Sequence, residues 1–258
     1  MQPLLAIAVG NTRTRIGLFT GTDLADAASH PNTDPAPLHR AIRDLLESHH
    51  EAPIVMASVN PPVADAVESV LEDSGERVLR INRDIAVPMK HALDDAATLG
   101  QDRILCAFGA YARAKQAVIV IDAGTCITVD FVDGQGTFQG GAIAPGLTLM
   151  LRSMHEGAAA LPSLDAAPPD TARGVFGKDT AHAMRLGAFA ACRGMVRHLI
   201  DTYADAFGAY PQIVATGGDA SVLFKDDDLV ESIVPDLQLI GILEAVKAAG
   251  DDHEEAQG

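Results

Sequence analysis

The sequence predicts an α/β protein made of two related domains. Two stretches, residues 4–19 and 117–130, share one layout: an apolar strand, a turn with glycine, and a second β-rich strand. The chain has 258 residues and is 48% hydrophobic, which is enough for two modest cores. An offset of 114 residues superimposes the two stretches, placing Ile7 on Ile121, Gly10 on Gly124 and Thr14 on Thr128.

The composition excludes several classes of partner. The formal charge is -16 at pH 7, so the chain has no excess basic surface to neutralise the phosphates of nucleic acid or of an anionic membrane. We therefore expect neither nucleic acid nor a membrane as a partner, although backbone N–H groups can still bind a small anion. Aromatic residues make up 4% of the chain and Trp is absent, which predicts an aliphatic core.

The cysteines and the start of the chain predict a cytoplasmic protein. Cys106, Cys126 and Cys192 are odd in number, form no C-x-x-C pair and lie in or beside apolar runs, which is typical of reduced thiols. Residues 1–3 lack the basic region of a secretory leader, and the apolar runs are far shorter than a membrane span.

The first domain is predicted over residues 1–115. Leu38, Ile42 and Leu45 recur at helical spacing, and Pro61-Pro62 is typical of the first turn of a helix. The expected elements are a hairpin turning at 21–23, a helix over 36–49, a strand over 53–59, a helix over 61–71, a strand over 77–81 and a helix starting near residue 101. Alternating strands and helices of this kind indicate an α/β layer structure.

The second domain is predicted over residues 116–258. After the repeated strands we expect a hairpin turn at 134–136, a helix opened by Pro145-Gly146 and a loop over 158–171. A long helix over 180–207, a strand over 212–216, a helix over 238–248 and a solvated acidic tail over 251–255 complete the chain.

The repeated loops are suited to phosphate. Gly124 lacks the Cβ that would keep a ligand away, the Thr125 hydroxyl and backbone N–H groups can donate to anionic oxygens, and Asp122 can organise a cation beside them. The first copy has Ala8 at the position of Asp122. A duplicated unit of this kind is what an enzyme needs to hold a nucleoside triphosphate in a cleft between two related domains.

A third glycine turn, Thr216-Gly217-Gly218, follows a predicted strand and could lie against an adenosine moiety. A single such turn is usually only a turn, but three in one α/β chain favour nucleotide binding. Arg13 and Arg15 beside the first loop either neutralise phosphate or lie on a strand surface.

Asp102 is the candidate general base. A carboxylate within reach of a substrate hydroxyl can accept its proton while the oxygen attacks a γ-phosphoryl group. The alternative is a helix-capping residue paired with Arg103, because a carboxylate is favoured in the first turn of a helix. Thr180 has a similar alternative, since it could simply cap its own helix.

Taken together, these motifs resemble the type III pantothenate kinase family, which has an acetate and sugar kinase/Hsp70/actin-type fold with two related actin/ribonuclease-H-like domains and mixed sheets. The resemblance covers nearly the full length. The stretches that carry it are residues 9–12, 99–103, 122–125, 140–146, 177–180, 216–218 and 235–243.

The resemblance implies ATP-dependent phosphorylation of pantothenate to 4'-phosphopantothenate, the first step of coenzyme A synthesis, by a cytoplasmic homodimer that needs Mg²⁺ and a monovalent cation, K⁺ or NH₄⁺. It implies that Asp102 accepts the proton and that Asp122 holds the monovalent cation. Pantothenate would contact Gly100, Gln101, Asp102, Arg103 and Thr180. ATP would contact Ala8, Val9, Gly10, Asn11, Thr12, Arg13, Thr14, Arg15, Thr125, Gly217 and Gly218.

The sequence departs from the family pattern at three places. Ala8 replaces an Asp, Leu93 replaces a Tyr that packs on pantothenate, and residues 158–162 lack the Thr of Thr-Ala-x-Leu-Pro. The main hypothesis is a working kinase, with reduced activity and with Arg13 partly replacing the missing charge at phosphate. The alternatives are a non-catalytic or regulatory paralogue that keeps the nucleotide cleft, and a related kinase for another small hydroxyl substrate.

Overall fold

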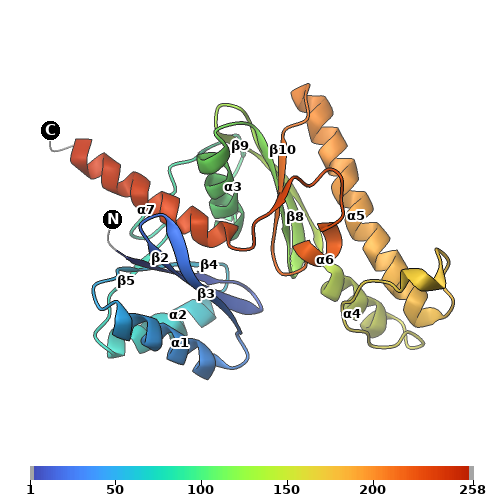
Figure 1. Ribbon diagram of the computed structural model, residues 1–258, viewed down its shortest axis with the longest axis horizontal. Coiled ribbons are helices and arrows are strands. Elements are labelled where there is room, and N and C mark those ends of the chain that lie inside the picture. The colour runs from blue at the N-terminus through green and yellow to red at the C-terminus, as the bar shows by residue number, and fades with distance from the viewer. Residues whose placement is uncertain (1–2, 256–258) are drawn as a thin grey trace. The chain divides into compact units, whose positions relative to one another are not determined.

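The computed structural model describes residues 3–255, and its contacts divide the chain into two compact units (Figure 1). The first unit contains residues 1–90, 94–113 and 237–258, and the second contains residues 91–93 and 114–236. The predicted boundary near residue 115 agrees with this division. The predicted end of the second domain at residue 258 is wrong, because the last helix packs on strands of the first unit.

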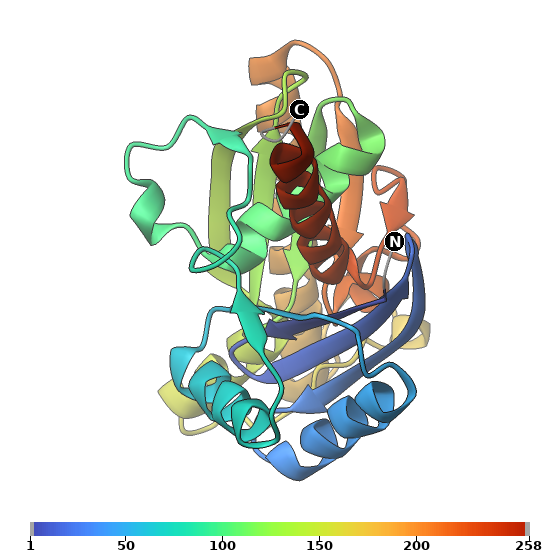
Figure 2. The same cartoon turned by 90° about the vertical axis from the view of Figure 1, so that its left-hand side faces the viewer.

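The first unit is built on a five-stranded sheet in the order β3-β2-β1-β4-β5. Its strands are β1 (Leu4–Val9), β2 (Arg13–Thr20), β3 (Asp23–Pro31), β4 (Ile54–Ser58) and β5 (Val78–Arg80). Its helices are α1 (Pro35–Ser48), α2 (Pro61–Asp73), the 3₁₀ turn η1 (Ala96–Thr98), α3 (Gln101–Ala114) and α7 (Leu237–Glu255). Helices α1 and α2 cover one face of this sheet and α7 covers the other, as Figures 1 and 2 both show.

The second unit repeats this arrangement in the order β11-β10-β7-β8-β9, with the short β6 added beside β9. Its strands are β6 (Lys90–His91), β7 (Val118–Ala123), β8 (Cys126–Val132), β9 (Thr137–Pro145), β10 (Gln212–Thr216) and β11 (Ser232–Ile233). Its helices are α4 (Leu147–Gly157), the 3₁₀ turn η2 (Thr171–Arg173), α5 (Thr180–Phe207) and α6 (Ala220–Phe224). The two sheets thus share one topology, three antiparallel strands followed by two parallel ones, so the repeat extends over all five strands.

The register shows one departure from the simple offset of 114. Val9 pairs with Thr14 in the first hairpin, whereas Ala123 pairs with Ile127 in the second. The second loop is therefore one residue shorter. As a result Thr128 corresponds in space to Arg15, and the predicted match of Thr14 with Thr128 is wrong.

Each unit has its own aliphatic core, as the composition predicts. In the first unit Leu5, Ile7 and Val9 of β1 face α1 and α2. In the second unit Ile119, Ile121 and alternate residues of β8 face α4, α5 and α6. The three cysteines are free thiols, Cys106 and Cys192 buried and Cys126 partly so.

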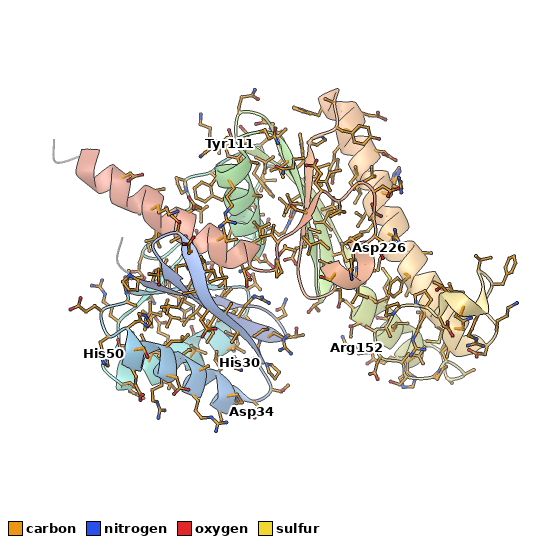
Figure 3. All side chains as sticks on the ribbon, in the orientation of Figure 1. His30, Asp34, His50, Tyr111, Arg152 and Asp226 are labelled. Atoms are coloured by element: carbon orange, nitrogen blue, oxygen red, sulfur yellow. The ribbon has the colours of Figure 1, made fainter. Side chains whose placement is uncertain are left out.

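Most predicted helices begin and end within a few residues of the observed ones. Asp34 caps α1 by accepting from the Ala36 N–H at 3.1 Å, and His50 lies just beyond the other end of that helix (Figure 3). The predicted end of the last helix at residue 248 is wrong, because α7 continues through residues 251–255 to Glu255. No helix in the part of the chain described here is long and apolar enough to cross a membrane.

Two glycines bring α3 and α7 together in the first unit. A Cβ on Gly109 would lie 2.9 Å from the backbone N of Gly241, and a Cβ on Gly241 would collide with the carbonyl of Leu105. This close backbone approach fixes α7 against the helix that carries Asp102.

We expect Gly241→Ala to lower the free energy of unfolding by about 1–3 kcal/mol. The added methyl group would collide with the backbone of Leu105, and no side-chain rotamer change can relieve that contact. Gly250→Ala, in the same helix with nothing within 4 Å of the new Cβ, should stabilise by up to about 1 kcal/mol. Denaturant unfolding of both variants measures the difference, and equal stability would contradict the contact.

Glu68 on α2 is buried between two arginines. Its Oε2 accepts from Arg80 Nη2 at 2.6 Å and its Oε1 accepts from Arg83 Nη2 at 2.7 Å. Burial alone raises the pKa of Glu68, but the hydrogen bonds from Arg83 and Arg80 outweigh it and hold the pKa below its ordinary value of 4.5. A lowered pKa in the folded state stabilises the fold above pH 4.5, and this contribution is lost as the pH falls through the folded pKa.

Glu68→Gln should therefore lower the free energy of unfolding by about 1–3 kcal/mol at neutral pH, because it leaves the arginines without their buried acceptor. The difference from wild type should shrink as the pH falls below 4.5. Exposed Glu72 on the same helix supplies the control Glu72→Gln. A Glu68→Gln deficit that stays constant from pH 7 to pH 3 would contradict the ion pairs.

Candidate active site

The first glycine loop joins β1 to β2 and is held from the side of β3. The Gly10 N–H donates to the carbonyl of Arg13 at 2.9 Å, which closes the turn. The Asn32 side chain donates to Gly10 O at 2.8 Å and accepts from the Thr14 hydroxyl at 2.9 Å. Asn32 was missed from the sequence because it lies 22 residues from Gly10. These bonds fix the loop backbone in place.

Not every residue predicted to contact ATP faces outward. Val9 and Thr14 have no exposed surface, and the Thr14 hydroxyl serves the loop through Asn32. The Arg13 guanidinium donates to Ser29 Oγ at 2.9 Å and to Ser29 O at 2.8 Å, so it lies along β3.

Arg15 stands directly opposite Ala8 across β1 and β2, and Ala57 of β4 stands opposite Ala8 on its other side. Ala8 is only 2% exposed. The row Arg15, Ala8, Ala57 therefore carries one positive charge and no acid, which suits an anion rather than a cation.

Asp102 lies in the first turn of α3, and Gly100 gives it room. The Asp102 Oδ1 accepts from the backbone N–H of Arg103 at 2.8 Å. A Cβ on Gly100 would collide with that same oxygen. Asp102 thus accepts from one of the N–H groups of the first turn, as the capping alternative predicts, and the donor is the backbone of Arg103. This bond holds the carboxylate at the positive end of the helix.

Gln101 ties the start of α3 to two strands. Its Oε1 accepts from the Ser58 N–H at 2.9 Å, at the end of β4, and its Nε2 donates to Ile81 O at 3.2 Å. The Asn60 side chain, two residues after Ser58, donates to Asn11 O at 3.3 Å. The structure thereby brings the first glycine loop and the turn of Asp102 to one edge of the first sheet. Gln101 positions this turn with both ends of its amide.

In the second unit, the loop of Gly124 and Thr125 is packed by the start of α4. The Gly146 N–H donates to Thr125 O at 3.0 Å, and a Cβ on Gly146 would collide with Gly124 O. Gly146 therefore lets the α4 N-terminus approach this loop.

The third glycine turn packs on Asp122. Gly217 has a φ of +92°, and a Cβ there would collide with Ala123 O and with Asp122 Oδ1. A Cβ on Gly218 would meet nothing within 4 Å. The backbone of Gly218 is therefore open to a ligand, while Gly217 is required for the close approach to Asp122.

Asp219 belongs to this group and was not predicted. Its N–H donates to Ala123 O at 2.9 Å, and burial raises the pKa of its carboxyl. Burial, followed by the charge of Asp219, raises the pKa of Cys192 to about 11. The position of Asp219 directly after the Gly217-Gly218 turn was the signal that could have identified it.

Thr180 is the exposed first residue of α5. The predicted alternative that it caps its helix is wrong, because Asp179 does so by accepting from the His182 N–H at 2.8 Å. This hydrogen bond from the His182 backbone, together with one from the Arg173 side chain, lowers the pKa of Asp179. The Thr180 hydroxyl is therefore not committed to the cap.

Leu93, at the position of the family Tyr, lies over β9. A Cβ on Gly140 would come 3.2 Å from Leu93 Cδ2, and the adjacent Ala92 N–H donates to Phe138 O at 2.9 Å. This segment thus belongs to the edge of the second sheet.

Among residues 3–255 no group of three or more His, Cys, Asp or Glu side chains is placed to hold a metal ion. The cross-strand row at Asp122 instead contains one carboxylate and two neutral hydroxyl oxygens. The cross-strand neighbours of Asp122 are Thr128 on β8 and Thr216 on β10. This donor set fits a monovalent cation better than Mg²⁺, which is usually held by carboxylates and phosphates and keeps several waters.

Comparison with known proteins gives consistent results. The profile of the type III pantothenate kinase family matches residues 4–202. A type III pantothenate kinase from Frankia alni is 32% identical over 251 residues, 93% of this chain and 96% of the relative. One from Syntrophotalea carbinolica is 30% identical over 253 residues, with 93% and 96% covered.

Solved structures agree on the fold. A protein described as a Baf family transcriptional activator from Campylobacter jejuni has a TM-score of 0.62 at 18% identity, covering 96% of this chain and all of that one. The activator of 2-hydroxyisocaproyl-CoA dehydratase from Clostridium difficile has a TM-score of 0.52 at 14% identity, covering 99% and 97%. These likenesses confirm the predicted actin-type α/β fold with mixed sheets. The matches over most of its length show that this chain belongs to the type III pantothenate kinase family.

Proposed function

We propose that this protein transfers the γ-phosphoryl group of ATP to the primary hydroxyl of pantothenate, forming 4'-phosphopantothenate for coenzyme A synthesis. The observation that carries the proposal is the turn of Asp102. Gly100 makes room for its carboxylate, Gln101 anchors the turn to two strands, and the chain belongs to the type III pantothenate kinase family.

In the first unit, Asp102 accepts the proton of the substrate hydroxyl as its oxygen attacks phosphorus. The backbone N–H groups of Asn11 and Thr12 and the positive charge of Arg15 stabilise phosphate oxygens, which gain charge in the transition state. Arg103 and Gly100 contact pantothenate beside the base. Thr180, whose hydroxyl is not used in capping, also contacts pantothenate.

In the second unit, Thr125 donates to phosphate and the open backbone of Gly218 lies against adenosine. Asp122 holds the monovalent cation. Mg²⁺, when bound with ATP, neutralises phosphate charge; because Ala8 replaces the acid of the first loop, the chain offers it no carboxylate there. The protein acts as a homodimer in the cytoplasm, and its mass in solution by light scattering tests the dimer.

The deciding measurement is ADP release at saturating ATP, Mg²⁺ and K⁺, with and without pantothenate. We expect pantothenate-dependent release by wild type. Ala8→Asp should raise kcat about tenfold or more, because a carboxylate at this site restores a charged partner for the metal–phosphate end, and tenfold corresponds to about 1.4 kcal/mol of transition-state stabilisation. Ala8→Asn, of the same size without the charge, is the control.

The absence of the acid at position 8 favours a second candidate, a non-catalytic paralogue that binds nucleotide. It predicts ATP binding by calorimetry without pantothenate-dependent ADP release, and little turnover from Ala8→Asp. Release that depends on another small alcohol would instead support the related-kinase alternative.

A further inference from the structure

The hydroxyl of Thr128 lies buried in the second sheet without a hydrogen-bond partner. Thr128 is 9% exposed, and its Oγ1 is fully enclosed and bonds to no other group of the described chain. A buried hydroxyl left unpaired costs about 1–3 kcal/mol, so each such group needs an explanation, of which a bound ion or ligand is one.

The register shows what this hydroxyl faces. Thr128 pairs directly with Asp122 across β7 and β8, and Asp122 pairs with Thr216 across β7 and β10. Directly paired residues project from the same face of a sheet, with Cβ atoms about 4.5–5.5 Å apart. Three oxygen-bearing side chains therefore form one row with the carboxylate in the middle.

The equivalent row of the first unit shows that this composition is not imposed by the fold. There the matching positions are Arg15, Ala8 and Ala57, a cation and two methyl groups. The same strand pairs thus present a positive row in one unit and an oxygen row with one negative charge in the other. A phosphate is repelled by the second row, whereas a cation of charge +1 is neutralised by it.

We propose that the Thr128 hydroxyl is a further ligand of the monovalent cation held at Asp122, giving a lone pair of Oγ1 to the ion. This proposal rests on the function proposed above for its choice of cation, and on the unpaired hydroxyl and the strand register for its residue. Thr216, 3% exposed, completes the row on the other side of the carboxylate.

The test is cation binding by the full-length protein, read from thermal unfolding without substrates. KCl is titrated at constant ionic strength, with tetramethylammonium chloride as the balancing salt, and the series is repeated with ATP. Wild type should show a saturable rise in Tm, and Asp122→Asn should abolish it. Thr128→Val, which keeps the branched shape, should raise the half-saturating KCl concentration about tenfold.

Thr128→Ser, which keeps the hydroxyl, should stay within about threefold of wild type, since the ligand oxygen is retained. Thr202→Val is the matched control, because the Thr202 hydroxyl donates to His198 O at 2.7 Å within α5 and should not affect the cation. A Thr128→Val protein with wild-type half-saturation overturns the proposal, as does a wild type without a saturable response. A change in ATP affinity alone would assign the hydroxyl to phosphate and also overturn it.

The ADP-release assay separates this inference from the proposed function. If wild type releases ADP with pantothenate but Thr128→Val binds K⁺ normally, the inference fails and the kinase stands. If Thr128→Val weakens K⁺ binding in a protein that phosphorylates nothing, the cation ligand stands and the proposed function fails.

Discussion

Asp102→Asn is expected to lower kcat for pantothenate phosphorylation by about two to four orders of magnitude, the usual contribution of a positioned general base. The amide has the shape of the carboxylate and can still accept from the Arg103 N–H, so the helix start should persist. The KM for ATP should change little, because Asp102 is proposed to act on the hydroxyl alone. Steady-state ADP release measures both constants. Asp73→Asn, at an exposed position at the end of α2, is the control.

Gly100→Ala tests the position of the same carboxylate without changing its charge. The new Cβ would collide with Asp102 Oδ1, so we expect the side chain to turn away and kcat to fall at least about tenfold, as misplaced catalytic groups do. Gly187→Ala on α5, where nothing lies within 4 Å of the new Cβ, should retain wild-type kcat. If Asp102→Asn and Gly100→Ala both kept full activity, another group would be the base.

Gly217→Ala should have the largest effect in the second unit. The substitution forces Ala to a φ of +92° and drives its Cβ into Ala123 O and Asp122 Oδ1. Left-handed strain of about 1–3 kcal/mol adds to the displacement of Asp122, so we expect a lower Tm and weaker cation and ATP binding. Thermal unfolding and calorimetry with ATP measure these effects.

Gly218→Ala is the neighbouring comparison for stability. Its Cβ would meet nothing within 4 Å, so its Tm should stay close to that of wild type. Any loss of ATP affinity in Gly218→Ala would then report contact with the ligand rather than a distorted fold. Equal Tm values for Gly217→Ala and Gly218→Ala would contradict the packing of this turn on Asp122.

The periodicity of the sequence was sufficient for most of the secondary structure. Apolar residues at helical spacing identified α1, and the helix predicted over 180–207 matches α5 at both ends. The last helix was predicted to end at residue 248, seven residues too early, because acidic residues are equally compatible with a solvated tail and with a helix. The last helix was assigned to the wrong unit because local patterns do not state which sheet an apolar face covers.

By itself the sequence determined the two related α/β domains, the three glycine turns and the family, because strand patterns, glycines and motifs are local properties of the chain. Only the tertiary structure decided that the second hairpin is one residue shorter and that Thr128 is the residue paired with Asp122. It also decided that Asn32 holds the first loop and that Gln101 positions Asp102. These facts depend on strand register and on contacts between distant residues, and a one-residue change in a loop reverses the face of every side chain that follows.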